Sequence, residues 1–129
     1  MSVSKIACKL ELKGKGSIDL ALYRHLAPLT VGALVRAMPI MGRVSIFPRT
    51  VCILTGIRTG VEKQRYEFAT GDVVFMAASG MLCVMLGSAK SDRPLNPVGK
   101  IEQGVEILQK AGPGDTLELR LVHETGDQT

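Results

Sequence analysis

Short stretches in which apolar and polar residues alternate are the feature that most restricts the fold of this 129-residue chain. Residues 5–12 and 17–22 both alternate with a period of two, which is the period of a half-buried β-strand. The linking residues 13–16 are Lys-Gly-Lys-Gly, and no helix follows them directly. They therefore indicate a hairpin turn rather than a phosphate-binding loop. The chain is predicted to open with an antiparallel hairpin.

Two later stretches have a helical period. In residues 27–38 apolar side chains recur at three- and four-residue spacing, with Pro28 at the start and Pro39 as a stop. A second, shorter helix is expected at residues 102–111. The remaining apolar segments predict strands, and residues 87–97, which are dense in turn residues, predict the longest loop. The expected strands after the opening hairpin are 44–47, 50–57, 64–68, 73–78, 81–86 and 116–122.

About eight short strands with two helices indicate one closed barrel. The helices fall early and late rather than after every strand, which disfavours a parallel doubly wound sheet. The chain length suits one domain. We therefore expect a mainly β protein, a closed eight-stranded antiparallel barrel capped by two helices. This single domain would span 1–129, with a core at about 4–122 and a polar tail at 123–129.

Cysteine usage and apolar runs indicate a cytoplasmic protein. The three cysteines show no CxxC spacing and lie in apolar alternating stretches, which favours buried free thiols in a reducing compartment. The N-terminus lacks the pattern of a signal peptide, and the uncharged run 73–89 is interrupted by Ser79-Gly80, as two strands around a turn would be. His25 and His123 have no candidate ligand partner nearby in sequence, so no metal site and no cofactor is expected.

Basic residues concentrate in the middle of the chain. Segment 36–65 contains six basic side chains against Glu62 alone. These residues could form a face that contacts phosphate groups, or they could be outward positions on solvated strands and loops. Only 4% of the residues are aromatic and there is no Trp, which disfavours stacking on single-stranded nucleic acid.

Three stretches resemble a known superfamily. Residues 27–43 begin Ala-Pro-x-Thr-Val and end in Pro39-Ile40-Met41-Gly42-Arg43, and residues 71–87 and 96–108 support the same similarity. Together they make residues 4–122 resemble the cyclophilin-like superfamily, most closely its small uncharacterised prokaryotic branch of minimal cyclophilin-like proteins. The resemblance implies an eight-stranded barrel closed by two helices, in agreement with the strand pattern.

The resemblance also implies candidate site residues. Cyclophilins that isomerise prolyl peptide bonds use an Arg that donates a hydrogen bond toward the prolyl nitrogen and so favours the twisted amide. In this chain Phe47-Pro48-Arg49 matches the string that carries the Arg, which makes Arg49 the candidate catalytic residue. Arg43 is a competing candidate for a functional guanidinium. The implied ligand-binding groove contains Arg43, Phe47, Arg49, Met76, Ala77, Met81 and Val84.

Departures from the cyclophilin pattern concern the chemistry of that groove. Val84 stands where an aromatic ring lines the proline pocket, the Trp is absent, and residues 54–56 replace the stretch that carries a glutamine. The favoured hypothesis is therefore a cytoplasmic module that binds a peptide segment, a protein or a small ligand without efficient isomerase activity. Two alternatives stay open: a prolyl isomerase with a degenerate site, and a basic accessory protein of a nucleic-acid or ribonucleoprotein assembly acting through residues 36–65. No membrane partner is expected.

Overall fold

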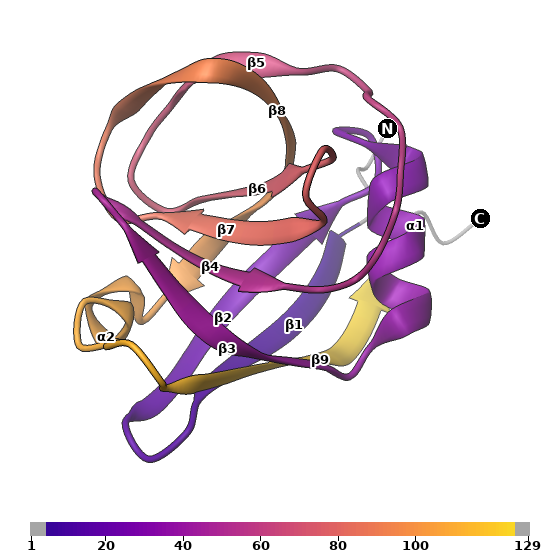
Figure 1. Cartoon of the computed structure of the whole chain (residues 1–129). Helices are drawn as coiled ribbons and strands as arrows, with labels where there is room; N and C mark the ends of the chain where they lie inside the picture. Colours follow the sequence, from indigo (N-terminus) through magenta and orange to yellow (C-terminus); the bar gives the residue numbers. More distant parts are fainter. Residues whose placement is uncertain (1–4, 126–129) are drawn as a thin grey trace.

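A closed antiparallel barrel of eight strands forms the body of the molecule in the computed structural model, which describes residues 5–125 except for the side chains of Ala89 and Thr125 (Figure 1). Neighbouring strands follow the order β2-β1-β9-β3-β4-β7-β6-β8, and pairing of β8 with β2 closes the ring. The predicted fold class is confirmed. The barrel strands are β1 (Lys5–Leu12), β2 (Gly16–Tyr23), β3 (Ile40–Phe47), β4 (Thr50–Leu54), β6 (Asp72–Met76), β7 (Met81–Met85), β8 (Ala89–Gln103) and β9 (Thr116–Thr125).

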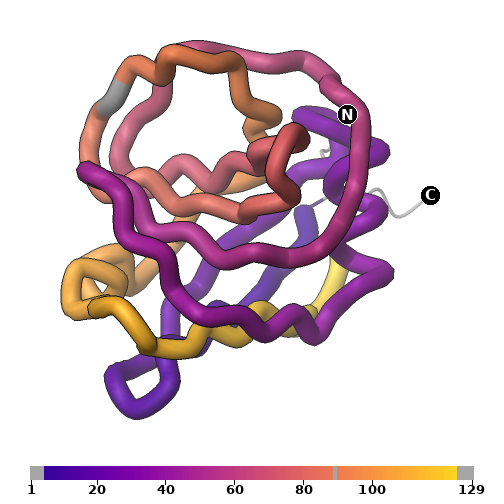
Figure 2. The backbone as a smooth tube through the Cα atoms, in the orientation of Figure 1, coloured from indigo at the N-terminus to yellow at the C-terminus, as the bar shows by residue number. Residues whose placement is uncertain are grey.

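The strand β8 is long enough to serve two sheets. Its C-terminal half pairs with β6 and β2 inside the barrel, while residues 89–95 pair with β5 (Arg65–Phe68). The chain trace shows these two segments arching away from the barrel above β6 and β7 (Figures 1 and 2). We call β5 together with residues 89–95 the arm.

The helices lie on different sides of the barrel (Figure 1). Helix α1 (Pro28–Ala37) places Val31 and Leu34 in the cluster that fills the barrel, as its periodicity predicts. Helix α2 (Val105–Leu108) is shorter than expected, because Ile101 and Gln103 still pair with β2 and Gly104 then breaks the strand with a φ of 96°. Neither helix of the described residues is long and apolar enough to cross a membrane.

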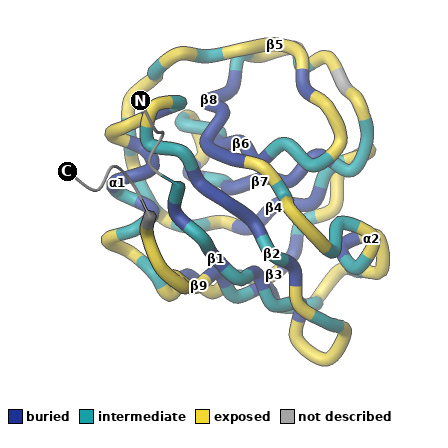
Figure 3. The backbone as a smooth tube through the Cα atoms, turned by 180° about the vertical axis from the view of Figure 1, so that it is seen from behind, coloured by how far each residue is buried: buried dark blue, intermediate teal, exposed yellow. Residues whose placement is uncertain are grey.

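Strands β4, β6 and β7 are buried on both faces. One side of each strand, including Ile53, Phe75 and Val84, belongs to the main core inside the barrel. The other side contributes Cys52, Val74 and other residues to a second, smaller cluster that the arm covers. In Figure 3 the buried backbone of these strands contrasts with the largely exposed arm. Burial on both faces explains why their sequences are almost uninterrupted apolar runs.

The expected loop at residues 87–97 is wrong, since most of it is the first half of β8. Pro97 is accommodated because the pairing of β8 with β6 shifts register beside it. The barrel therefore contains β8 and excludes β5, whereas the sequence prediction counted 64–68 as a barrel strand and 87–97 as a loop. The polar tail was also placed too early, because His123–Thr125 belong to β9, whereas residues 126–129 lie outside the described residues.

Candidate functional site

An apolar pocket of about 400 Å³ lies between the outer wall of the barrel and the arm. This volume is within the range of ligand-binding pockets in proteins. We call it the arm pocket. Its lining residues are Phe47, Pro48, Thr50, Cys52, Met76, Cys83, Met85, Lys90, Ser91, Asp92 and Leu95.

Strand register determines which side chains reach the pocket. Cys52 of β4 lies directly opposite Cys83 of β7, and Thr50 lies opposite Met85. Because successive side chains of a strand point to opposite faces, these residues face outward while their neighbours fill the barrel. The Thr50 hydroxyl contacts the Met85 sulfur at 3.8 Å. The pocket floor is thus the outer face of β4 and β7.

Cys52 and Cys83 form a disulfide across these two strands, with their Cα atoms 4.1 Å apart. The expectation that all three cysteines are free thiols is therefore wrong for this pair, because strand register brings together two residues that are far apart in sequence. Cys8 is buried and free as expected, and burial raises the pKa of its thiol to about 12. Of the three cysteines, only Cys8 is therefore the free thiol that is typical of a reducing compartment.

The rim of the pocket combines charge with an exposed ring. The exposed side chains of Lys90 and Asp92, from the arm, carry opposite charges. From the barrel, Phe47 at the end of β3 also lines the pocket and has 48% of its surface exposed. A ligand in this pocket would meet an apolar floor, one aromatic ring and both signs of charge.

Five of the predicted groove residues are apolar, and the structure places them in three different surroundings. Phe47 and Met76 line the arm pocket, and Met81 packs against the cluster beneath it. Val84 is 3% exposed and belongs to the barrel interior, so its side chain is on the other face of β7. Ala77 lies in the β6–β7 turn and lines a separate cavity of about 250 Å³ with Gly56 and neighbouring residues.

Neither predicted arginine lines the arm pocket. Arg49 occupies the tight turn between β3 and β4 with a φ of 59°, and its guanidinium donates a hydrogen bond of 3.1 Å to the carbonyl oxygen of Ser88. Arg43 is exposed on β3, opposite Thr116 of β9. The structure therefore does not bring these two side chains together over the pocket.

Sequence reasoning missed most of the pocket lining. The two-residue period of a strand puts Cys52 on the same face as Thr50, and Cys83 on the same face as Met85, but it does not show that these two strands are neighbours. Residues 90–95 show no strand pattern, because their polar residues and Pro94 are typical of a loop. The arm contributes Lys90, Ser91, Asp92 and Leu95.

A partly buried polar network, built on the half-buried Glu62 and the buried Thr30 and Asn96, anchors the loop that leads into the arm. The carboxylate of Glu62 accepts hydrogen bonds from the amides of Leu29 and Thr30, at 3.0 and 2.8 Å, and from the Thr30 hydroxyl at 2.5 Å. Asn96 of β8 accepts a bond from the Glu62 amide and donates to the Thr30 hydroxyl. Burial by itself raises the pKa of Glu62, but these three bonds to its carboxylate outweigh burial and lower the pKa.

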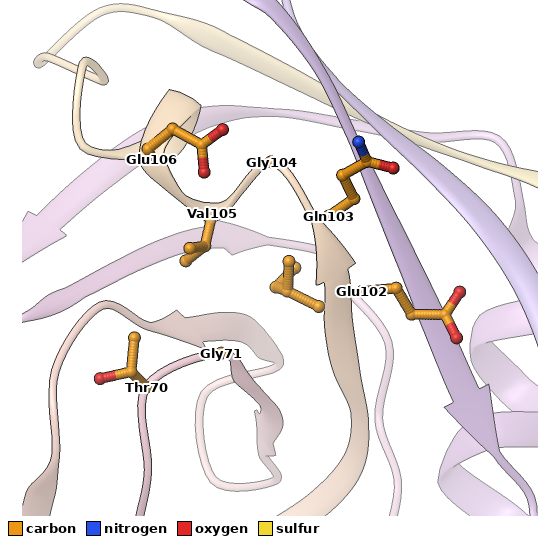
Figure 4. A pocket seen from close by; sticks show the side chains of 8 residues that line it. Thr70, Gly71, Glu102, Gln103, Gly104, Val105 and Glu106 are labelled. Carbon is orange, nitrogen blue, oxygen red and sulfur yellow. The ribbon is translucent and has the colours of Figure 1, made fainter.

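A second pocket, of about 350 Å³, lies at the C-terminal end of β8, beside the start of α2 (Figure 4). It is lined by Thr70 and Gly71 from the turn before β6 and by residues 101–106. Glu102 extends away from the centre of this pocket in Figure 4 and forms an ion pair with Lys5. The lining presents no constellation of groups suited to acid–base or nucleophilic chemistry.

The six basic residues of segment 36–65 are all exposed. They are distributed over α1, β3, the β3–β4 turn, the loop before β5 and β5 itself. None of the ion pairs within residues 5–125 involves them. The residues are Arg36, Arg43, Arg49, Arg58, Lys63 and Arg65.

Comparison with known proteins relates this chain to others by fold alone. No family model matches the sequence, and no curated protein matches it. The solution structure of the hypothetical protein AF2241 from Archaeoglobus fulgidus is similar, with a TM-score of 0.79 and 18% identity over 92% of this chain and 95% of that one. McbB, solved in complex with tryptophan, is also similar, with a TM-score of 0.74 and 14% identity over 88% of this chain. The chain spans only 44% of McbB.

Proposed function

We propose that this protein is a cyclophilin-like binding module whose arm pocket accepts an apolar side chain of a peptide segment, or a small apolar ligand. The observation that carries the proposal is the pocket itself, a concave apolar space of about 400 Å³ with charged groups at its rim. Pockets of this kind, apolar with a few polar groups that fix orientation, are the usual form of small-ligand sites.

The geometry favours binding over prolyl isomerisation. The isomerase mechanism requires a guanidinium that donates to the prolyl nitrogen within the site. Arg49 instead donates to Ser88, and Lys90 is the one cationic side chain among the residues that line the pocket. A prolyl group in the arm pocket would therefore lack the donor that stabilises the twisted amide.

The expected affinity is modest. Burying one leucine- or phenylalanine-sized side chain contributes about 1.5–3 kcal/mol. A dissociation constant of 1 mM corresponds to about 4.1 kcal/mol, so a single anchor must be supplemented by polar contacts at the rim. Lys90, Ser91 and Asp92 are placed to supply such contacts to a peptide backbone or a polar ligand group.

Chemical-shift mapping with short peptides and apolar fragments tests the proposal. We expect shifts concentrated on residues around the arm pocket, and at least tenfold weaker binding in Phe47→Ala because the ring borders the pocket. Ile46→Ala is the matched control, since Ile46 adjoins Phe47 and is similarly exposed, at 45%, but does not line the pocket. Equal weakening in both variants, or shifts confined to another surface, would overturn the proposal.

An isomerisation assay separates binding from catalysis. Exchange of an Ala-Pro peptide should proceed at the uncatalysed rate when the protein is added. Arg49→Ala should bind the same ligands with unchanged affinity. An acceleration that disappears in Arg49→Ala would instead establish the degenerate isomerase.

The exposed arginines of segment 36–65, which take part in none of the ion pairs within residues 5–125, favour a second candidate function, contact with nucleic-acid phosphates. Affinity for an RNA or DNA duplex should then fall steeply with salt, and Arg43→Glu together with Arg58→Glu should weaken it. Lys110→Glu, an exposed cation near α2, is the matched control. Binding that survives the double substitution would rule this candidate out.

A further inference from the structure

Sulfur atoms concentrate at the arm pocket. The chain contains six methionines and three cysteines, and five of these residues lie on the outer face of three adjacent strands. Four of the five line the pocket, and the fifth packs against the same cluster. The pocket residues are Cys52, Met76, Cys83 and Met85, and the fifth residue is Met81.

Strand register places these sulfur groups around one point. Cys52 and Cys83 face each other directly, and Met85 lies two positions along β7 on the same face as Cys83. Met76 is opposite Met81, so it is the diagonal neighbour of Cys83. Diagonal cross-strand residues are within reach of long side chains, and methionine is unbranched and adaptable.

The donor set selects a class of metal ion. Thiolate and thioether sulfurs are soft ligands that favour Cu(I), whereas zinc sites use four nitrogen, oxygen or thiolate donors. Within residues 5–125 no group of three or more His, Cys, Asp or Glu side chains is placed to hold a metal. Two cysteines supplemented by methionines therefore suit a soft monovalent cation and not zinc.

We propose that the reduced Cys52–Cys83 pair, together with Met76 and Met85, binds one Cu(I) ion in the arm pocket. A dithiol reductant first opens the disulfide: it transfers two electrons and two protons to Cys52 and Cys83, and closes its own disulfide. Cu(I) then displaces the two thiol protons as two copper–sulfur bonds form, and the thioethers of Met76 and Met85 complete the coordination.

The surroundings support a bound ion of this kind. Two thiolates with one Cu(I) carry a net charge of −1, and the pocket rim holds both a cation, Lys90, and an anion, Asp92, of which Lys90 provides the opposite charge. The two cysteines are about 1% exposed, so the arm and the barrel wall shield the site from bulk water. A sulfur donor set shielded from water also disfavours Cu(II), which prefers nitrogen and oxygen ligands, and the pocket gives the ion a path of entry.

The test is a titration of the whole chain, reduced with a phosphine and desalted without oxygen. Native mass spectrometry with Ag(I), and competition against a chromophoric Cu(I) chelator, should both report one ion per chain. The methyl resonances of Met76 and Met85 should shift on Ag(I) addition. The oxidised protein, whose cysteines are joined, should bind neither ion at this site.

Variants identify the ligands. Met76→Leu and Met85→Leu preserve apolar volume and should each weaken Cu(I) binding by about tenfold or more, in the range seen when supporting groups of metal sites are removed. Cys52→Ser with Cys83→Ser should abolish binding. Met41→Leu, which removes an exposed thioether elsewhere, and Cys8→Ser, which removes the buried free thiol, should leave binding unchanged.

Several results would overturn this inference. Failure of the reduced chain to bind Cu(I) tightly would exclude the site. Binding that persists without Cys52 and Cys83, or unchanged affinity in both methionine variants, would exclude it equally. The methionine variants keep the test decisive even where the double serine variant fails to fold. The metal site goes beyond the proposed ligand-binding function and does not depend on it. The titration uses the ions alone, so it can fail while peptides still bind, and peptide binding can fail while the reduced chain still binds Cu(I).

Discussion

At the scale of single residues, Glu62 shows how a loop is fixed to both a helix and a strand. Its carboxylate accepts from the first amides of α1, where no side chain of the preceding residue caps the helix. An anion at a helix N-terminus satisfies amides that lack partners and interacts favourably with the helix dipole. Asn96 joins the same network from β8, so one carboxylate helps to position the chain that leads into the arm.

Replacing Glu62 by Gln should destabilise the protein by about 0.5–2 kcal/mol at neutral pH, as loss of a helix cap does. Because the folded-state pKa of Glu62 is lowered from the ordinary 4.5, its stabilisation is present above that value and is lost as the pH falls through the folded-state pKa. The difference between wild type and Glu62→Gln should therefore shrink in acid.

Urea unfolding across this pH range measures both effects. Glu67→Gln, an exposed carboxylate on β5, is the control for loss of a surface charge. A difference between wild type and Glu62→Gln that is constant from neutral pH into acid would contradict the proposed role of the ionised carboxylate.

At the scale of elements, β4 and β7 connect the two hydrophobic clusters. One face of each strand fills the barrel and the other forms the floor of the arm pocket. The disulfide joins these strands on the outer face, and it encloses a loop that contains β5 and β6. Opening it removes a constraint on the unfolded chain, whereas β5 and β6 remain paired with β8 and β7 in the folded protein.

Replacing both Cys52 and Cys83 by Ala should lower the free energy of unfolding by about 3–4 kcal/mol, the chain-entropy value for a loop closed across a separation of 31 residues. Denaturant titration with and without reductant measures this loss. Wild type in reductant should approach the variant, whereas the variant itself should not respond to reductant. Equal stability of oxidised and reduced wild type would contradict the prediction.

The element scale also shows how far sequence patterns reach. Alternation was sufficient for β1 and β2, and short continuous apolar runs were sufficient for β4, β6 and β7, because each of these signals lies within one segment. The first half of β8 was not predicted as a strand, because Pro94, Pro97 and the polar residues between Ser88 and Arg93 are typical of turns. The prolines are tolerated there because residues 89–95 lie outside the barrel ladder and Pro97 lies at a register shift.

The candidate site was harder to predict than the fold, because sequence patterns act within one segment whereas the site is built from several strands. Phe47 and Met76 were identified through a resemblance, but the disulfide required the pairing of two strands separated by 31 residues. Val84 was assigned to the groove by position in a motif, whereas the alternation of β7 directs it inward. Which face a residue occupies was readable from the sequence, and which strand lies beside it was not.

At the scale of the whole molecule, the barrel depends on closure between β2 and β8. Gly99 lies in this seam, opposite Leu22 of β2 on one side and Val73 of β6 on the other. The β2 backbone approaches so closely that a Cβ atom at Gly99 would overlap the carbonyl oxygen of Ala21. A backbone carbonyl cannot move aside as the end of a flexible side chain can, so the absence of a side chain is required at this position.

Gly99→Ala should therefore destabilise the protein by about 3 kcal/mol, the upper end of the range for overpacking in a core. Gly60→Ala is the matched control, because its φ is outside the left-handed region and a Cβ there would have no neighbour within 4 Å. That variant should be neutral or more stable by about 0.4–1 kcal/mol through the unfolded state. Hydrogen exchange at the amides of β2 and β8 should accelerate in Gly99→Ala and not in Gly60→Ala. Equal stability of the two variants would mean that the seam can widen by a methyl group without cost, and closure of the barrel would not depend on this glycine.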